Sequence, residues 1–174
     1  VYGRLPHYAL SEKGQQMVRM SAQEFAQRAQ DGAKIVHLVC SPLLRTRESA
    51  APITELLGLE AHADQRVIEA DNYFEGEHVT KRGLLRNRER WGKLYNPLRP
   101  SWGEPYLDQV KRMASAIQDA ARTAYDKGGE GAQAIIVSHQ LPIWVTRLGL
   151  EGRLLQHDPR TRQCNLASIT SLDF

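Results

Sequence analysis

The stretch from Ile35 to Ser49, IVHLVCSPLLRTRES, joins an apolar run to a basic one. Residues 34–40, KIVHLVC, form a short β-branched run that predicts a strand buried in a sheet. Pro42 suits the first turn of a helix, and residues 48–57 continue that helix as far as Gly58. A buried strand that leads directly into a helix is typical of α/β domains.

Helical patterns and short apolar runs alternate on both sides of this unit. Upstream, Ser11 is a suitable N-cap for a helix whose apolar residues recur at spacings of 4, 3 and 4 and which ends at Asp31-Gly32. Downstream, a helix is expected from Pro105 to Gly128-Gly129, and Pro142 begins another helical turn. Short strands are predicted at Val67-Ile68, at 134–138 (AIIVS) and at 166–174 (LASITSLDF).

This alternation predicts a three-layer α/β/α sandwich that forms a single domain over residues 1–174. Residues 71–105 differ, because glycines and prolines interrupt any period there. So long an irregular stretch is usually functional, and we expect a cap or lid. Residues 81–100 within it hold seven Lys and Arg against one acid, a net charge of +6 in a chain of net charge +3. This run fits either a solvated face or the attraction of an anionic ligand.

The lengths of the apolar stretches and the cysteine spacing argue against a membrane protein, a disulfide-rich protein and a metal-binding protein. No stretch is apolar and long enough to span a bilayer, and no signal peptide is visible, so a cytoplasmic protein without a membrane partner is expected. Cys40 and Cys164 lie 124 positions apart without metal-ligand spacing, and two cysteines are too few for a disulfide scaffold. We therefore expect no metal site and no cofactor. The modest net charge does not by itself imply a nucleic-acid partner.

Cys40 lies where a catalytic thiolate could sit, so its spacing to the arginines matters. Cysteine phosphatases place five residues between the cysteine and an arginine, but the position after five residues here is Thr46, with Arg45 and Arg47 on either side. The spacing fails, which favours Cys40 as a buried residue at the end of a strand. Arg47 lies about 200° round the helix from Arg45 and is expected on the surface.

Three polar residues follow three separate apolar runs. Arg45 would lie in the first turn of a helix, where a guanidinium and free backbone N–H groups can bind phosphate or carboxylate. His139 stands between a buried strand and a helix start, and Glu69 follows Val67-Ile68. Taken singly, these residues fit a surface arginine, a hydrogen-bonded turn histidine and a solvated glutamate. Together they favour a ligand site at the carboxyl ends of parallel strands.

An ordered set of fragments runs along almost the whole chain: Gly3-Arg4, 10–17 (LSEKGQQM), 41–49 (SPLLRTRES), 68–76 (IEADNYFEG), 103–113 (GEPYLDQVKRM), 137–140 (VSHQ) and 165–170 (NLASIT). This set resembles the histidine phosphatase superfamily, also called the phosphoglycerate mutase-like family. The resemblance implies helices around a mostly parallel sheet and phosphoryl transfer through a phosphohistidine.

The resemblance also implies roles for individual residues. Arg45 resembles the phosphate-clamping arginine of a Ser-Pro-Leu-x-Arg motif, and His139 resembles the second histidine of the phosphate pocket. Glu69 resembles the acid that protonates the leaving oxygen, a role that needs a proton held near neutral pH. Glu75, in a neighbouring Glu-Gly, is the rival for that role. Substrate contacts are expected from Arg4, Glu75 and Gln140.

Two departures from the family pattern affect these expectations. The family's Arg-His-Gly motif, which carries the nucleophilic histidine and a second clamping arginine, precedes the Gly-Arg loop. This sequence begins inside that loop, so we expect the nucleophile and its strand upstream. His7 does not match, because it lies in Pro6-His7-Tyr8. Gln140 replaces the usual glycine, and its side chain is expected to narrow the pocket while its backbone N–H still faces the phosphoryl group.

The function expected from this resemblance is metal-independent hydrolysis of a small phosphorylated substrate. Three alternatives stay open: a phosphoglycerate mutase, a non-catalytic module that binds a phosphorylated ligand, and, with less support, a nucleic-acid binder resting on residues 81–100. The sequence identifies neither the substrate nor the oligomeric state, for which a homodimer is one option.

Overall fold

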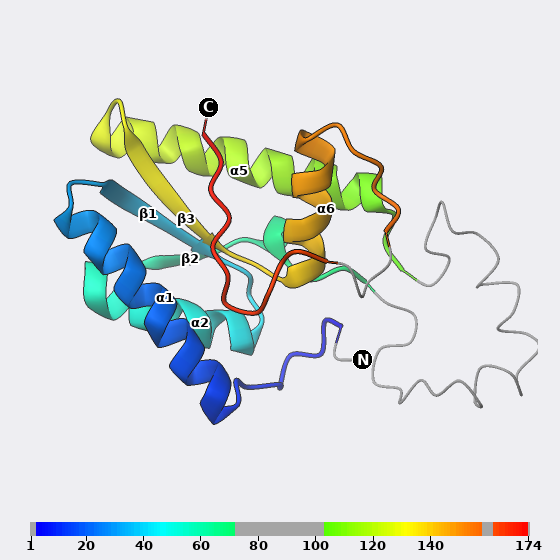
Figure 1. Cartoon of the computed structure of the whole chain (residues 1–174), viewed down its shortest axis with the longest axis horizontal. Helices are drawn as coiled ribbons and strands as arrows, with labels where there is room; N and C mark the ends of the chain where they lie inside the picture. The colour runs from blue at the N-terminus through cyan, green and yellow to red at the C-terminus, as the bar shows by residue number, and fades with distance from the viewer. Residues whose placement is uncertain (1–2, 72–102, 158–161, 174) are drawn as a thin grey trace, which may run out of the picture.

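The structure is a computed structural model, and it describes residues 3–71, 103–157 and 162–173. Its elements follow one another as α1 (Glu12–Gln30), β1 (Lys34–Cys40), α2 (Leu44–Leu57), β2 (Ala61–Ala63), the 3₁₀ helix η1 (Gln65–Val67), α5 (Tyr106–Gly128), β3 (Ala132–Val137) and α6 (Gln140–Leu150) (Figure 1).

The three strands form one parallel sheet in the order β2-β1-β3. Leu38 in the central strand pairs with Ala61 on one side and with Ile135 on the other. Because all three strands run in the same direction, their carboxyl ends meet at one edge of the sheet. The predicted α/β class and the parallel sheet are confirmed.

Helices cover both faces of the sheet (Figure 1). On one face, Leu38 and Cys40 pack with Ala22 of α1 and with Ala50 and Ile53 of α2. The residues that alternate with these in the strands point to the other face, where they meet α5 in a second cluster of Val39, Val67, Met113, Ala116 and Ala120. The three layers therefore follow from strands that are apolar on both sides.

The predicted ends of the helices are set by local capping. The Ser11 side chain accepts a hydrogen bond from the Gly14 N–H at 3.1 Å, which caps α1. Gly58 ends α2 with φ 67°, a left-handed conformation that disfavours any residue with a Cβ. The helix expected to begin at Pro42 begins two residues later, with α2 at Leu44. The helix expected to begin at Pro142 begins two residues earlier, with α6 at Gln140.

The strand predicted at Val67-Ile68 is wrong, because Val67 ends a 3₁₀ turn instead. The Asp64 carboxylate accepts from the Arg66 N–H at 2.7 Å and turns the chain there. Val67 is nevertheless fully buried, so its apolar side chain indicates the core and not the strand. The strand beside β1 is residues 61–63, which no strand pattern in the sequence marked.

The final strand predicted at 166–174 is also wrong over residues 166–173. Ala167 adopts φ 56°, and the Ser168 N–H donates to the Asn165 carbonyl at 3.2 Å, so the chain turns there. Among the described residues, no strand pairs with the outer edge of β3. An extended segment therefore has no ladder to join.

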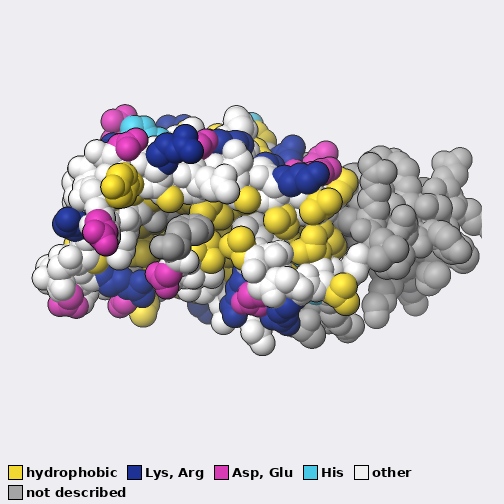
Figure 2. All heavy atoms as spheres, turned by 90° about the horizontal axis from the view of Figure 1, so that it is seen from above, with side chains coloured by type: hydrophobic (Ala, Val, Ile, Leu, Met, Phe, Trp, Pro, Cys, Tyr) yellow, Lys and Arg dark blue, Asp and Glu magenta, His cyan; other side chains and the backbone are white. Residues whose placement is uncertain are grey.

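The C-terminal segment lies across the molecule between α1 and α6 (Figure 1). The Ser21 hydroxyl of α1 donates to the Ala167 carbonyl at 2.7 Å. Residues 169–172 line a groove with Arg147, Leu150 and Glu151 at the end of α6. Figure 2 shows hydrophobic side chains gathered in the middle of the face seen from above, with charged side chains of both signs around them.

The predicted cap at 71–105 lies almost wholly outside the described residues, as do Trp91, Trp102 and the basic run 81–100. The cap, and the assignment of residues 1–174 to one domain, stay predictions. No helix in the described ranges is long and apolar enough to cross a membrane.

Candidate active site

Candidate side chains collect at the carboxyl edge of the parallel sheet. β1 ends at Cys40 and β3 at Val137, so Ser41 and His139 follow two neighbouring strand ends. Arg45 lies in the first turn of α2, and Glu69 lies two residues after η1. The structure thus brings together Arg45, Glu69 and His139, which are far apart in sequence.

His139 is the most enclosed of these groups. It is the N-cap residue of α6 and is 7% exposed. Its Nε2 lies 2.8 Å from the Ser41 hydroxyl, and its Nδ1 lies 3.9 Å from a carboxylate oxygen of Glu69. Burial, and then the positive charges of Arg45 and Arg112, lower the pKa of His139 to about 3. The imidazole is therefore neutral at physiological pH and can offer one N–H to an anionic oxygen.

Glu69 is poised to keep a proton. Burial raises the pKa of its carboxyl group above the usual value. The Ala70 N–H, which donates to the carboxylate at 2.9 Å, and the charges of Arg45, Arg162 and Arg112 oppose this rise without cancelling it. A carboxylic acid of this kind can donate a proton to a leaving group at a pH where an exposed glutamate is already ionised.

Arg45 connects α2 to the N-terminal loop. Its guanidinium donates to the Gly3 carbonyl at 2.6 Å and to the Leu5 carbonyl at 3.3 Å. Its charge also acts on both His139 and Glu69. Arg45 is thus a half-buried cation between the loop and the two titratable groups, where it can hold a phosphoryl oxygen.

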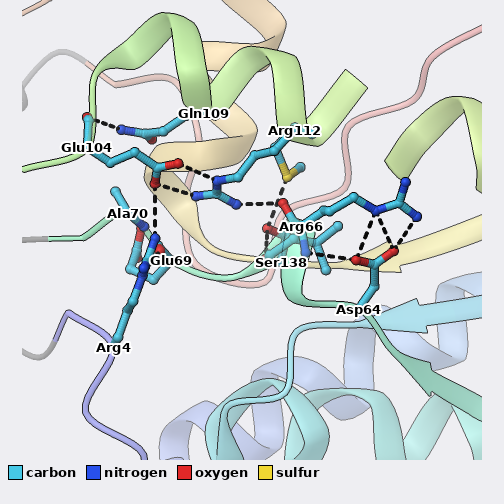
Figure 3. Close-up of polar contacts among 11 residues, drawn as sticks. Arg4, Asp64, Arg66, Glu69, Ala70, Glu104, Gln109, Arg112 and Ser138 are labelled. Atoms are coloured by element: carbon cyan, nitrogen blue, oxygen red, sulfur yellow. Dashed lines mark hydrogen bonds and ion pairs between the residues drawn. The ribbon is translucent and has the colours of Figure 1, made fainter. Parts of the chain in front are cut away.

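Two residues that the sequence analysis did not single out complete this network (Figure 3). Glu104 binds Arg112 through both carboxylate oxygens, at 2.7 and 2.9 Å, and also binds Arg4 at 3.1 Å. Arg112 in turn donates to the Arg66 carbonyl, and Arg4 donates to the Glu69 carbonyl at 2.8 Å. Glu104 therefore positions two arginines whose guanidinium groups donate hydrogen bonds to the backbone carbonyls of Arg66 and Glu69. Glu104 and Arg112 both lie within segment 103–113, whose match to the family pattern was the one signal in the sequence that could have indicated them.

Removal of the Glu104 charge is expected to destabilise the fold. Glu104→Gln leaves Arg112 and Arg4 without a carboxylate partner among the described residues. Because unpaired cations that are half-buried are unfavourable, we expect the free energy of unfolding to fall by about 2–4 kcal/mol. Urea denaturation of both proteins measures this change. Glu151→Gln, which breaks exposed ion pairs to Arg147 and Arg153, serves as the matched control and should change stability little. Equal losses in the two variants would contradict a buttressing role for Glu104.

The remaining predicted residues have distinct positions. The Gln140 amide donates to the Cys164 carbonyl at 2.6 Å, so its side chain ties α6 to the C-terminal segment. Arg4 contacts the Glu69 backbone, as described above. Glu75 lies outside the described residues, and the choice between Glu69 and Glu75 as the acid stays a prediction.

Cys40 and Arg47 lie where the sequence predicts them, one buried and the other on the surface. Cys40 is buried at the end of β1, and burial raises the pKa of its thiol, which disfavours a nucleophilic thiolate. Arg47 is exposed. Within residues 3–71, 103–157 and 162–173, no group of three or more His, Cys, Asp or Glu side chains is placed to hold a metal ion.

Comparisons with known proteins identify relatives in sequence and solved structures of similar fold. The uncharacterized protein Rv0525 of Mycobacterium tuberculosis is 44% identical over 175 residues, which cover 100% of this chain and 82% of that protein. The probable phosphoglycerate mutase GpmB of Erwinia tasmaniensis is 28% identical over 164 residues, which cover 92% of this chain and 73% of that protein. A solved structure of mycobacterial glucosyl-3-phosphoglycerate phosphatase Rv2419c with inorganic phosphate superposes with a TM-score of 0.67 at 21% identity, covering 86% of this chain and 72% of that one.

The family assignment rests on the full length of the sequence. The sequence profile of the histidine phosphatase superfamily (branch 1) matches residues 1–174. The fold has the parallel sheet expected of this family, and Arg45, Glu69 and His139 gather at its carboxyl edge. The chain therefore belongs to the histidine phosphatase superfamily.

Proposed function

We propose that this protein hydrolyses small phosphomonoesters through a phosphohistidine intermediate. The observation that carries the proposal is the grouping of a buried neutral histidine, an acid with a raised pKa and an arginine at one sheet edge. Superfamily membership supports a phosphatase or mutase-like enzyme. The solved phosphatase Rv2419c supports the fold that presents such a site.

In the proposed mechanism, a histidine attacks phosphorus and the ester oxygen leaves with a proton from Glu69. Arg45 and His139 stabilise charge on the transferring phosphoryl oxygens. Water then attacks phosphorus, gives a proton to the Glu69 carboxylate and breaks the phosphorus–nitrogen bond, which releases inorganic phosphate and restores both the histidine and the acid. The nucleophile in this scheme is the histidine of the family's Arg-His-Gly motif. That motif does not occur in the 174 residues, so the tests below use the full-length protein.

Loss of Arg45 tests the proposal directly. Arg45→Ala removes a charge that would neutralise the phosphoryl group, so kcat for phosphomonoester hydrolysis should fall about 10³-fold. Phosphate release by the full-length protein measures it. Arg47→Ala, two positions along the same helix and exposed, should retain wild-type turnover. Full activity in Arg45→Ala would remove the basis of the assignment.

A phosphoglycerate mutase is the second candidate, since the GpmB relative from Erwinia tasmaniensis carries that designation. A mutase must keep its phosphorylated form long enough to return the phosphoryl group to a glycerate. Assay of 3-phosphoglycerate with and without a bisphosphate primer separates the two activities. Isomerisation that depends on the primer supports a mutase, and primer-independent phosphate release supports the phosphatase.

A further inference from the structure

Arg162 is a half-buried arginine without an acidic partner among the described residues. The other arginines discussed for the Glu69 loop, Arg4 and Arg112, share the Glu104 carboxylate. Arg162 instead donates from Nε to His157 Nε2 at 2.9 Å. Burial lowers the pKa of its guanidinium, although the group stays cationic at physiological pH. The cost of partly burying such a cation is offset when an anionic ligand binds to it.

His157 holds the arginine in place as a neutral ring. Its Nδ1 lies 2.8 Å from the Leu155 carbonyl and therefore carries the hydrogen, which leaves Nε2 to accept from Arg162. The ring packs between Tyr106, with centroids 5.6 Å apart, and Trp144, with centroids 6.1 Å apart. A neutral partner on Nε fixes the guanidinium without neutralising it. Within the described residues, the terminal amino groups of Arg162 make no hydrogen bond, so their donors can bind a second ligand.

Two series of contacts, made by the neighbours of Arg162, connect it to the candidate active site. On one side, Tyr106 follows closely after Glu104, whose partner Arg4 donates to the Glu69 carbonyl. On the other side, Cys164 accepts from the side chain of Gln140, the residue next to His139. The charge of Arg162 is also one of those that oppose the raised pKa of Glu69.

We propose that Arg162 binds a second anionic group of the substrate, so that the preferred phosphomonoesters carry a carboxylate or a second phosphoryl group. Both groups present two oxygens to the terminal donors of a guanidinium, which is the pairing that arginine favours. The phosphoryl group that reacts lies with Arg45 and His139, and the second anion lies at Arg162. This inference rests on the proposed function, because the ligand is taken to be a phosphomonoester.

Three esters with the same three-carbon chain test this subsite: propyl phosphate, phosphorylated hydroxypropionate and propanediol bisphosphate. Binding is measured by calorimetry in a Glu69→Gln background, where the missing acid slows turnover. We expect both doubly anionic esters to bind at least about tenfold more tightly than propyl phosphate. A gain limited to one of them identifies whether the second group is a carboxylate or a phosphoryl group.

The preference is the ratio of the Kd of propyl phosphate to the Kd of a doubly anionic ester. In the same background, the variant Arg162→Gln should reduce this ratio to nearly one. Arg162→Lys, which keeps the charge but not the paired donors, should keep part of it. Arg153→Gln is the matched control, because it removes an exposed arginine that pairs with Glu151, and it should keep the whole preference. A general role of Arg162 in folding would weaken all three esters alike and leave their ratio unchanged, which overturns the proposal.

Two other outcomes also decide the matter. Equal binding of the three esters, or a preference that persists in Arg162→Gln, overturns the second anion subsite. Phosphate release by the wild-type protein is measured separately. Binding with the expected preference but no release from any ester would support the subsite and contradict the phosphatase assignment, so the two failures are distinguishable.

Discussion

His139→Ala is expected to lower kcat for phosphomonoester hydrolysis by about 10³-fold. The imidazole is buried, hydrogen-bonded to Ser41 and neutral, because its pKa is lowered to about 3. It can therefore donate to a phosphoryl oxygen throughout the pH range in which the enzyme would work. Steady-state phosphate release by the full-length protein measures the loss.

The control for this prediction is His62→Ala, which removes an exposed histidine from β2. It should retain wild-type turnover, and circular dichroism should show both variants folded. The low pKa of His139 also predicts that wild-type activity is not lost through this residue as the pH falls from 8 to about 5. Comparable turnover in His139→Ala and His62→Ala would exclude His139 from the reaction.

Glu69→Gln is expected to lower turnover of alkyl phosphates by about 10²–10⁴-fold, because glutamine cannot donate a proton to the leaving oxygen. The loss should be much smaller for p-nitrophenyl phosphate, whose leaving group needs little protonation. The protonated carboxyl is the active form, so wild-type activity on alkyl phosphates should fall as the pH rises through the raised pKa of Glu69. This alkaline limb should be absent in the variant.

The same substitution predicts a gain in stability. Since the pKa of Glu69 is higher in the folded protein than in the unfolded chain, ionisation favours unfolding as the pH rises. Below the unfolded pKa, the group is protonated in both states and this effect is absent. Glu69→Gln should therefore be more stable than the wild type at neutral pH and no more stable at low pH. The role of Glu69 as proton donor would be contradicted if Glu69→Gln lost equal activity on alkyl phosphates and p-nitrophenyl phosphate and were less stable than the wild type at neutral pH.

The position of Arg45 and His139 at one edge could be predicted from the sequence because local signals mark strand ends. Glu69 was expected after a strand at Val67-Ile68, and it follows a 3₁₀ turn instead. The run 34–40 and the AIIV segment are apolar on both faces, which identifies strands of a parallel sheet. Carboxyl ends of such strands meet, so polar residues just beyond them come together whatever connects them. The positions of His139 and Arg45 could therefore be predicted without the structure of the loops.

The Glu104 network could not be predicted in this way. Its carboxylate binds Arg4 from the N-terminal loop and Arg112 from α5, and Arg112 also donates to the Arg66 carbonyl of η1. Only the packed structure brings these three segments together. Val67 shows a second limit of sequence reasoning. An apolar residue marks burial, but the Asp64 cap decides between a strand and a 3₁₀ turn.

We infer that this protein turns over phosphomonoesters at the site formed by Arg45, Glu69 and His139. The most direct measurement is inorganic phosphate release from an alkyl phosphate by the full-length protein, with the His139→Ala variant alongside and with EDTA present. We expect phosphate release that EDTA does not reduce and that falls about 10³-fold in the variant. Release that is equal in the two proteins, or no release by a wild-type protein that still binds phosphate, would contradict it.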